Sequence, residues 1–278
     1  MTDIAVLDRD TVSDLLGSRS NPFLNYEENR HAWGISRSMV FERPLLRTWD
    51  YFSGSRPEGT NRMLSRAPRQ CLNTSGVRRK SLTTHADHKN WTATPFISFT
   101  TSKIALQELA CLRRKRGTQT ITAINPNVRI AKGLPILDMM TEMNYYDILD
   151  PYGRSNAYYR DHYLCLWEVT SDEVIGHWEW SELVKNDHWY EEIVLPAFRE
   201  HDETLFSNPP GGGLFNFSTL LDELLENDES EVEYPSLEDT SSDELDASFE
   251  NEVYSDTDDE VEEANATDDM FKILEGDW

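Results

Sequence analysis

The side chains with the most obvious metal-binding chemistry are two histidines three residues apart. His85 and His88 enclose a segment that contains Asp87, and imidazole nitrogens and carboxylate oxygens are common ligands of zinc. With a further acid from elsewhere in the chain, these residues could hold an ion. A polar surface loop accounts for the same residues and is the commoner arrangement, so we predict no metal site.

Several well-characterised catalytic and nucleotide-binding motifs are absent from the sequence. It contains no G-x-G-x-x-G, no P-loop, no G-x-S-x-G and no H-E-x-x-H. The three cysteines, Cys71, Cys111 and Cys165, are widely spaced and odd in number, which fits neither a disulfide framework nor a zinc site. Cys165 lies in an apolar run and is predicted to be a small core residue.

Strands and helices alternate through the middle of the chain. Apolar periodicity and turn residues predict strands over 43–50, 94–100, 118–124, 162–169 and 174–180. Helices are predicted over 11–16, 103–116, 134–143 and 189–200, with Asp10 or Thr11 and Ser102 as the first two caps and a break or kink at Pro196. We expect long loops over 53–90 and a turn at 125–127. This order of elements predicts an α+β domain with mixed or antiparallel sheets.

Three segments taken together carry a family resemblance. They are residues 45–58, 94–102 and 162–178, which contain LLRTWD and SGSRPE, TPFISFTTS, and HYLCLWEV followed by VIGHW. In that order they resemble the three conserved regions of the ADP-ribosyltransferase superfamily, particularly the cholera-toxin and heat-labile-enterotoxin branch. They also resemble an uncharacterised toxin-like domain that is common in filamentous fungi. The resemblance implies an ADP-ribosyltransferase-like pair of small packed β-sheets with flanking helices.

The resemblance also implies NAD as the ligand and assigns roles to particular residues. Arg47 would contact the dinucleotide, since a guanidinium can fork onto phosphate or ribose oxygens, although a strand-end ion pair is an equally good explanation of it. Ser98 and Thr100 would shape the nicotinamide pocket, or serve as ordinary strand hydroxyls. The position of the family's glutamate falls on His162, next to Asp161.

Because the family's glutamate is missing at this position, two functions have to be considered. In the family, this carboxylate stabilises the positive charge that develops as nicotinamide leaves, and a histidine supplies no fixed negative charge. A degenerate, non-catalytic or weakly active binding module is therefore expected, with His162 or Asp161 filling the acid's role imperfectly. The alternative is an active NAD-dependent ADP-ribosyltransferase. Clustered tyrosines between 145 and 159 could stack on a ring of the ligand or pack a loop onto the sheet.

The net charge of −25 conceals an uneven layout. Residues 222–278 hold 24 acidic residues and one basic residue, whereas residues 43–132 hold 17 basic and 4 acidic ones. The basic half suits an anionic ligand such as a phosphate, or simply neutralises the acidic residues that follow it. Nucleic-acid binding by residues 43–132 remains a third functional class, since Arg113 to Arg116 form a basic cluster. The same cluster also suits the C-terminus of a helix.

The composition divides the chain into four parts. We predict an N-terminal arm at 1–42, an ADP-ribosyltransferase-like domain at 43–206, a linker and amphipathic segment at 207–226, and a disordered acidic tail at 227–278. Apolar islands in the last two parts could recruit an unknown protein partner. No signal peptide and no membrane-spanning run is visible, so a cytoplasmic or nuclear protein is expected.

Overall fold

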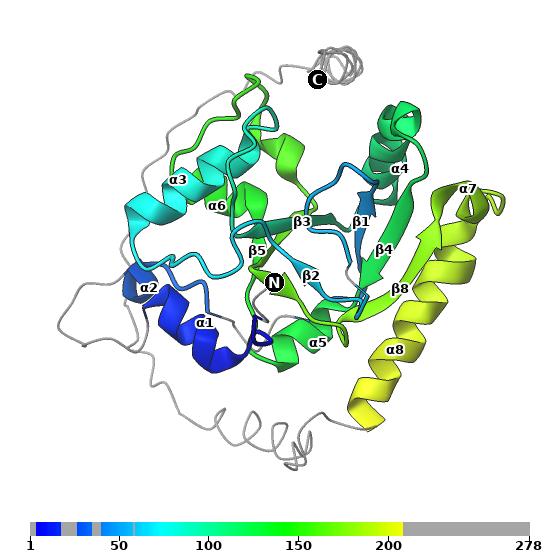
Figure 1. Ribbon diagram of the computed structural model, residues 1–278, viewed down its shortest axis with the longest axis horizontal. Helices are drawn as coiled ribbons and strands as arrows, with labels where there is room; N and C mark the ends of the chain where they lie inside the picture. Colours follow the sequence, from blue (N-terminus) through cyan, green and yellow to red (C-terminus); the bar gives the residue numbers. More distant parts are fainter. Residues whose placement is uncertain (1–3, 18–26, 35–39, 58, 208–278) are drawn as a thin grey trace, which may run out of the picture. The chain divides into compact units, whose positions relative to one another are not determined.

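The computed structural model describes residues 4–17, 27–34, 40–57 and 59–207 (Figure 1). Its chain contacts separate a unit at 1–207 from one at 208–278. The predicted acidic tail, and the amphipathic segment apart from Ser207, lie outside the described residues, so disorder and partner recruitment there stay predictions. Within the described residues, no helix combines the length and the apolar character needed to cross a membrane.

A six-stranded sheet forms the centre of the described domain. Its strand order is β5-β6-β3-β1-β4-β8, and every neighbouring pair is antiparallel. The strands are β1 (Leu45–Trp49), β3 (Phe96–Thr100), β4 (Thr120–Ile124), β5 (Ile136–Asp138), β6 (His162–Leu166) and β8 (Val174–Glu179). The α+β class and all five predicted strands are confirmed, although each strand is shorter than expected.

The sheet is weakly joined in its middle. Strand β1 pairs with β4 at five residue pairs, and β3 pairs with β6 at five. Between β1 and β3, however, one residue pair is formed, Leu46 with Thr100. The described sheet therefore consists of two three-stranded halves that meet at one residue pair. Beyond this pair, the space between β1 and β3 can admit a side chain.

Helices cover one face of this sheet. The register places Leu46, Ile121, Phe96 and Leu164 on that face. Over the β5-β6-β3 half lie α1 (Arg9–Leu16), α3 (Ser75–Ala86) and α6 (Met139–Tyr145), which share a core with it (Figure 1). Over the other half lie α4 (Lys103–Leu112), α7 (Trp180–Leu183) and the Tyr190–Val194 π-turn that leads into α8 (Leu195–Ser207).

A second, two-stranded sheet packs on the opposite face. Strand β2 (Met63–Leu64) pairs antiparallel with β7 (Glu168–Val169). Met63 and Val169 share a core cluster with Leu45, Ile97 and Cys165 of the large sheet. The prediction that Cys165 is a core residue is thus confirmed. The burial of this apolar face between two sheets is the main stabilising term for this side of the domain.

The expectation of long loops over 53–90 was wrong for strand β2 and helix α3, while the described residues at 53–57, 59–62 and 65–74 are irregular as expected. Thr74 caps α3 by accepting a hydrogen bond from the Val77 amide. The buried side of this helix carries Arg78 and Ser81 as well as Leu82, which disrupts the apolar spacing that reveals a helix. Arg78 is tolerated there because its guanidinium is paired with Glu28 and donates to backbone carbonyls.

Other predicted boundaries also needed correction. The helix expected at 134–143 is strand β5 followed by α6, whose cap Asp138 accepts from the Thr141 amide. The turn expected at 125–127 is the start of α5 (Pro126–Ala131), where Asn125 is the cap and proline occupies the first turn. Asp8, rather than Asp10 or Thr11, caps α1. Helix α4 has the predicted Ser102 cap but ends at Leu112, followed by a 3₁₀ turn over Arg113–Arg116.

Two irregularities interrupt long elements. The strand predicted over 162–169 divides at Trp167, whose positive φ of 60° turns the chain from the large sheet into β7. The break expected at Pro196 is instead a widened π-turn immediately upstream, after which α8 continues to Ser207. A proline ring clashes with the carbonyl four residues earlier, and a π-turn is one way of accommodating that clash.

A fully buried ion pair ties α5 to the chain between β7 and β8. The Arg129 guanidinium lies 2.9 Å from the Glu173 carboxylate, and neither side chain is exposed. Arg129 also donates to the carbonyls of Pro135, Leu166 and Glu168. The burial is offset by a complete set of partners, and the negative charge of Glu173 raises the pKa of Arg129 against the effect of desolvation.

We predict that Glu173→Gln lowers the free energy of unfolding by about 3 kcal/mol, because it leaves a buried guanidinium without its counter-charge. Urea denaturation measures this loss. Glu182→Gln is the matched control, since Glu182 belongs to an exposed pair with Lys185 that is worth less than about 1 kcal/mol. Equal effects of the two substitutions would contradict this account of the Arg129 pair.

Candidate functional site

Arg47 bridges the gap in the middle of the large sheet. Its Nη1 donates to the Ser98 carbonyl at 3.0 Å, and its Nη2 donates to the Gly54 carbonyl at 2.8 Å. Its Nε is buried and has no hydrogen-bond partner among the described residues. Burial, together with the positive charge of Arg113, lowers the pKa of Arg47 to about 10, so the guanidinium is charged at neutral pH. Arg47 therefore links the two halves of the sheet to the loop after β1, with one buried donor unsatisfied among the described residues.

The loop after β1 folds back over Arg47. Asp50 fastens this loop, because its Oδ1 accepts from the Phe52 amide at 2.9 Å and from the Ser53 hydroxyl at 3.0 Å. Ser55 has a positive φ of 55°, and Pro57 then bridges to Met63 at the start of β2. These contacts fix the loop, so its Gly54 carbonyl stays in reach of Arg47.

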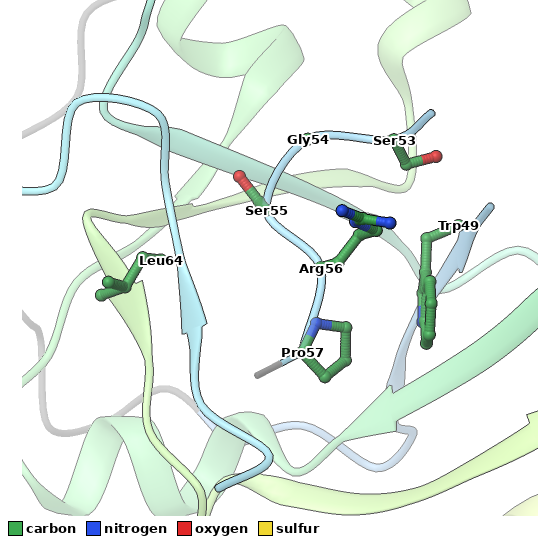
Figure 2. A pocket seen from close by; sticks show the side chains of 7 residues that line it. All are labelled: Trp49, Ser53, Gly54, Ser55, Arg56, Pro57 and Leu64. Carbon is green, nitrogen blue, oxygen red and sulfur yellow. The ribbon is translucent and has the colours of Figure 1, made fainter. Parts of the chain in front are cut away.

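A pocket of about 390 Å³ opens beside this loop (Figure 2). Figure 2 shows Trp49 on one side of it and Leu64 on the other, with the chain from Ser53 to Pro57 passing between them. Indole, proline and leucine side chains provide apolar contact area, while Arg56 and the backbone provide polar groups. A planar, partly polar ligand suits this combination.

Ser98 is joined to a histidine that the sequence did not assign to this site. His85, near the end of α3, lies 2.7 Å through Nε2 from the Ser98 hydroxyl and 2.9 Å through Nδ1 from the Thr94 hydroxyl. Burial, then the positive charges of His88 and Arg47, lower the pKa of His85 to about 3. A neutral imidazole has one donor and one acceptor nitrogen, so it orients both hydroxyls without carrying charge.

The strand register decides which faces the predicted residues occupy. Arg47 lies opposite Thr122 and shares the face of Phe99, whereas Ser98 and Thr100 share the opposite, helix-covered face with His162. The Arg47 guanidinium reaches Ser98 through its carbonyl, at the point where the β1–β3 ladder has ended. The Thr100 hydroxyl accepts from the Ser102 amide and so helps to start α4.

His162 and Asp161 begin β6 in different environments. His162 pairs with Thr100 and is half-buried; burial, then the charge of His88, lowers its pKa to about 4. His162 is consequently neutral at pH 7. Asp161 precedes the strand, is exposed, and has a positive φ of 63°. Its carbonyl accepts from the Thr101 amide, so it holds the strand end rather than presenting a buried acid.

Tyrosines and cations surround His162. Tyr158 packs edge-on against the imidazole at 5.8 Å, and the Arg154 guanidinium lies 3.7 Å from the centroid of the Tyr158 ring. Tyr152 stacks on His88 at 5.7 Å. These rings pack against His162 and His88, which favours the packing alternative for them.

A second polar chain runs across the other half of the sheet. The Trp49 indole donates to the Thr122 hydroxyl at 2.8 Å, and Thr122 lies 2.7 Å from His177 Nδ1. Since indole is a donor only, Thr122 accepts from Trp49, and its hydroxyl shares a second hydrogen bond with Nδ1 of His177. The His177 Nε2 is buried without a partner among the described residues. The chain fixes the orientation of Trp49 in the pocket wall.

Two residues of the basic cluster at Arg113–Arg116 make structural contacts. Arg113 donates to the Thr48 carbonyl at 3.2 Å, and Arg116 lies 3.7 Å from the buried Asp50 carboxylate. Arg114 and Lys115 are exposed. Glu168, the next acid along the chain from His162, is buried and paired with Arg62 and Arg69. These ion pairs anchor β7.

Sequence reasoning missed His85 because it placed that residue in a loop. No group of three or more His, Cys, Asp or Glu side chains in the described parts of the chain could hold a metal ion. The signal that could have placed His85 in a helix was Thr74, a helix-capping residue type at the start of the segment that leads to His85. The pocket-lining role of Trp49 and Arg56 was missed as well.

Comparison with known proteins identifies the family of the chain. A domain of unknown function (DUF7587) matches residues 44–183, which contain β1 to β8 and both ends of the Arg47 bridge. The chain belongs to this family. No curated protein and no solved structure matches it.

The depressed histidine pKa values predict how the domain responds to acid. An unfolded histidine titrates near 6.5. Between about pH 4 and 6.5, His85 and His162 therefore bind protons in the unfolded chain but stay neutral in the folded domain. The free energy of unfolding should therefore fall as pH decreases through this window. Urea denaturation at several pH values measures the slope, and His162→Gln should flatten it. An unchanged slope in that variant, or imidazole NMR signals of His162 that titrate near pH 6.5, would contradict the assignment.

Proposed function

We propose that this domain is a degenerate member of the ADP-ribosyltransferase fold that binds NAD at the gap between β1 and β3 and has weak or no transferase activity. The observation that carries the proposal is the Arg47 bridge. A charged guanidinium stands between the Ser98 and Gly54 carbonyls with its Nε unpartnered among the described residues. Such a donor suits a phosphate or ribose oxygen.

The arrangement of the strands also supports this proposal. The resemblance implied two small packed sheets, and the large sheet here consists of two halves that meet at the Leu46–Thr100 pair. Arg47 comes from one half and the Ser98 carbonyl from the other, and Arg47 also donates to Gly54 of the pocket loop at 53–57. The first two segments of the resemblance thus supply groups to one region.

The absence of a suitable acid favours binding over catalysis. A transferase of this kind needs a negative group that faces the positive charge developing on the ribose as nicotinamide leaves. His162 is neutral at pH 7, because its pKa is lowered to about 4. Asp161 is exposed and outside the strand. The active-enzyme alternative would require Asp161 to swing toward the ligand.

We expect NAD to raise the melting temperature of the full chain. At one hundred times its dissociation constant, a ligand stabilises by about 2.7 kcal/mol, or roughly 5–10 °C for a domain of this size. Arg47→Lys keeps the positive charge but loses the fork, so most of this NAD-induced shift should disappear. Arg114→Lys, at an exposed position, is the matched control. A full shift in the Arg47 variant would refute the proposed site.

Restoring the missing acid should restore some chemistry. We expect His162→Glu to increase the release of nicotinamide from NAD by about tenfold over the wild type, which is modest against the roughly 100-fold or more of a fully preorganised group. His162→Gln controls for the loss of imidazole without adding charge. Nicotinamide release is followed by chromatography. If the wild type already releases nicotinamide at the rate of the glutamate variant, the domain is not degenerate.

A further inference from the structure

Three large aromatic side chains near the 51–57 loop are turned to solvent. Tyr51 is 75% exposed, Phe52 is 60% exposed and Trp91 is 59% exposed. Isolated exposed apolar residues are common in proteins, but a group of them marks an interaction surface. Tyr51 and Phe52 are in edge contact at 5.4 Å, so they present two rings in perpendicular planes.

Each of these rings has an arginine against it. The guanidinium carbons of Arg56, Arg66 and Arg116 lie 5.2, 5.7 and 6.0 Å from the ring centroids of Tyr51, Trp91 and Phe52 respectively. We call these six residues the aromatic–arginine surface. A ring that is more than half exposed while a guanidinium covers one side has its other side open to water, and that side is available for stacking.

The two parts of the aromatic–arginine surface are linked through the loop. A side chain at Gly54 would meet the Arg66 side chain at 3.2 Å, and Gly54 lies between Phe52 and Arg56 in sequence. Arg66 in turn donates to the Trp91 carbonyl at 2.7 Å. The Arg66 side chain therefore lies against the loop at Gly54 and also contacts Trp91, which links the loop to the third ring.

The charge of this region is strongly positive. Arg114 and Lys115, exposed beside Arg116, extend it. The neighbouring acid Asp50 has no exposed side-chain area, because it is covered by its own loop and by Arg116. A polyanion that approaches here would meet arginines and a lysine without an exposed carboxylate from Asp50.

We propose that the aromatic–arginine surface binds single-stranded nucleic acid, with bases stacked on Tyr51, Phe52 and Trp91 and phosphates paired with the arginines. Alternating rings and cations match a polymer in which bases alternate with phosphates. An acidic peptide would use the cations but leave three exposed rings without a partner. Bases in a duplex are already stacked, so a single strand is the preferred form. This surface shares Arg56 with the pocket beside Arg47, but the proposal does not depend on NAD binding there.

The test is a binding titration with the full chain and a fluorescent oligouridine of about ten nucleotides, a typical site size, in about 0.1 M salt, where charges are screened beyond about 10 Å. We expect binding that weakens by about tenfold or more in Tyr51→Ala and in Trp91→Ala. Leu149→Ala is the matched control, since Leu149 is 81% exposed and lies outside this surface. Arg56→Gln should reduce the slope of log affinity against log salt by about 0.7.

Binding of polyglutamate and of a duplex is compared with binding of oligouridine. Polyglutamate supplies negative charge without bases, and it should bind much more weakly than oligouridine. Equal binding of both polymers, unaffected by Tyr51→Ala, would mean that the surface takes acidic peptides and would overturn the proposal. Failure of the full chain to bind oligouridine, or preference for a duplex of the same sequence, would overturn it as well.

Discussion

The candidate site depends on the desolvated guanidinium of Arg47. A part-buried cation must find acceptors, and here it finds two backbone carbonyls that belong to separate pieces of the fold. The Ser98 carbonyl can accept from it because the ladder between β1 and β3 ends after the Leu46–Thr100 pair. The Gly54 carbonyl can do so because Asp50 fastens the loop. If this bridge were lost, the two halves of the sheet would still meet at the Leu46–Thr100 pair, but the pocket loop would lose its hydrogen bond from Arg47.

Positive charge shapes the chemistry around this bridge. Burial is the main cause of the lowered pKa of His85 and of His162, and nearby positive charge, that of Arg47 at His85 included, adds to it, so both imidazoles are neutral at pH 7. A neutral His85 can hold the hydroxyls of Ser98 and Thr94, but it is a poor base. The region is therefore better suited to holding an anionic ligand than to moving protons, as the proposed binding function requires.

Local patterns in the sequence reveal some of this architecture and conceal the rest. Strands such as β3 and β4 were predictable because β-branched and aromatic residues recur in short runs between turn residues. Helix α3 was not, because Arg78 and Ser81 occupy its buried side, and the error removed His85 from the site. Arg47 and Ser98 were predicted to cooperate, through a family resemblance. The opening between β1 and β3 depends on long-range register, which no local pattern contains.

A crystal structure of the full chain with saturating NAD would test the central claim most directly. The account predicts density for the dinucleotide in the opening between β1 and β3, with a phosphate or ribose oxygen about 3 Å from Arg47 Nε and the Ser98 and Gly54 contacts retained. An empty opening, or NAD bound elsewhere while Arg47 Nε keeps its present surroundings, would contradict the account.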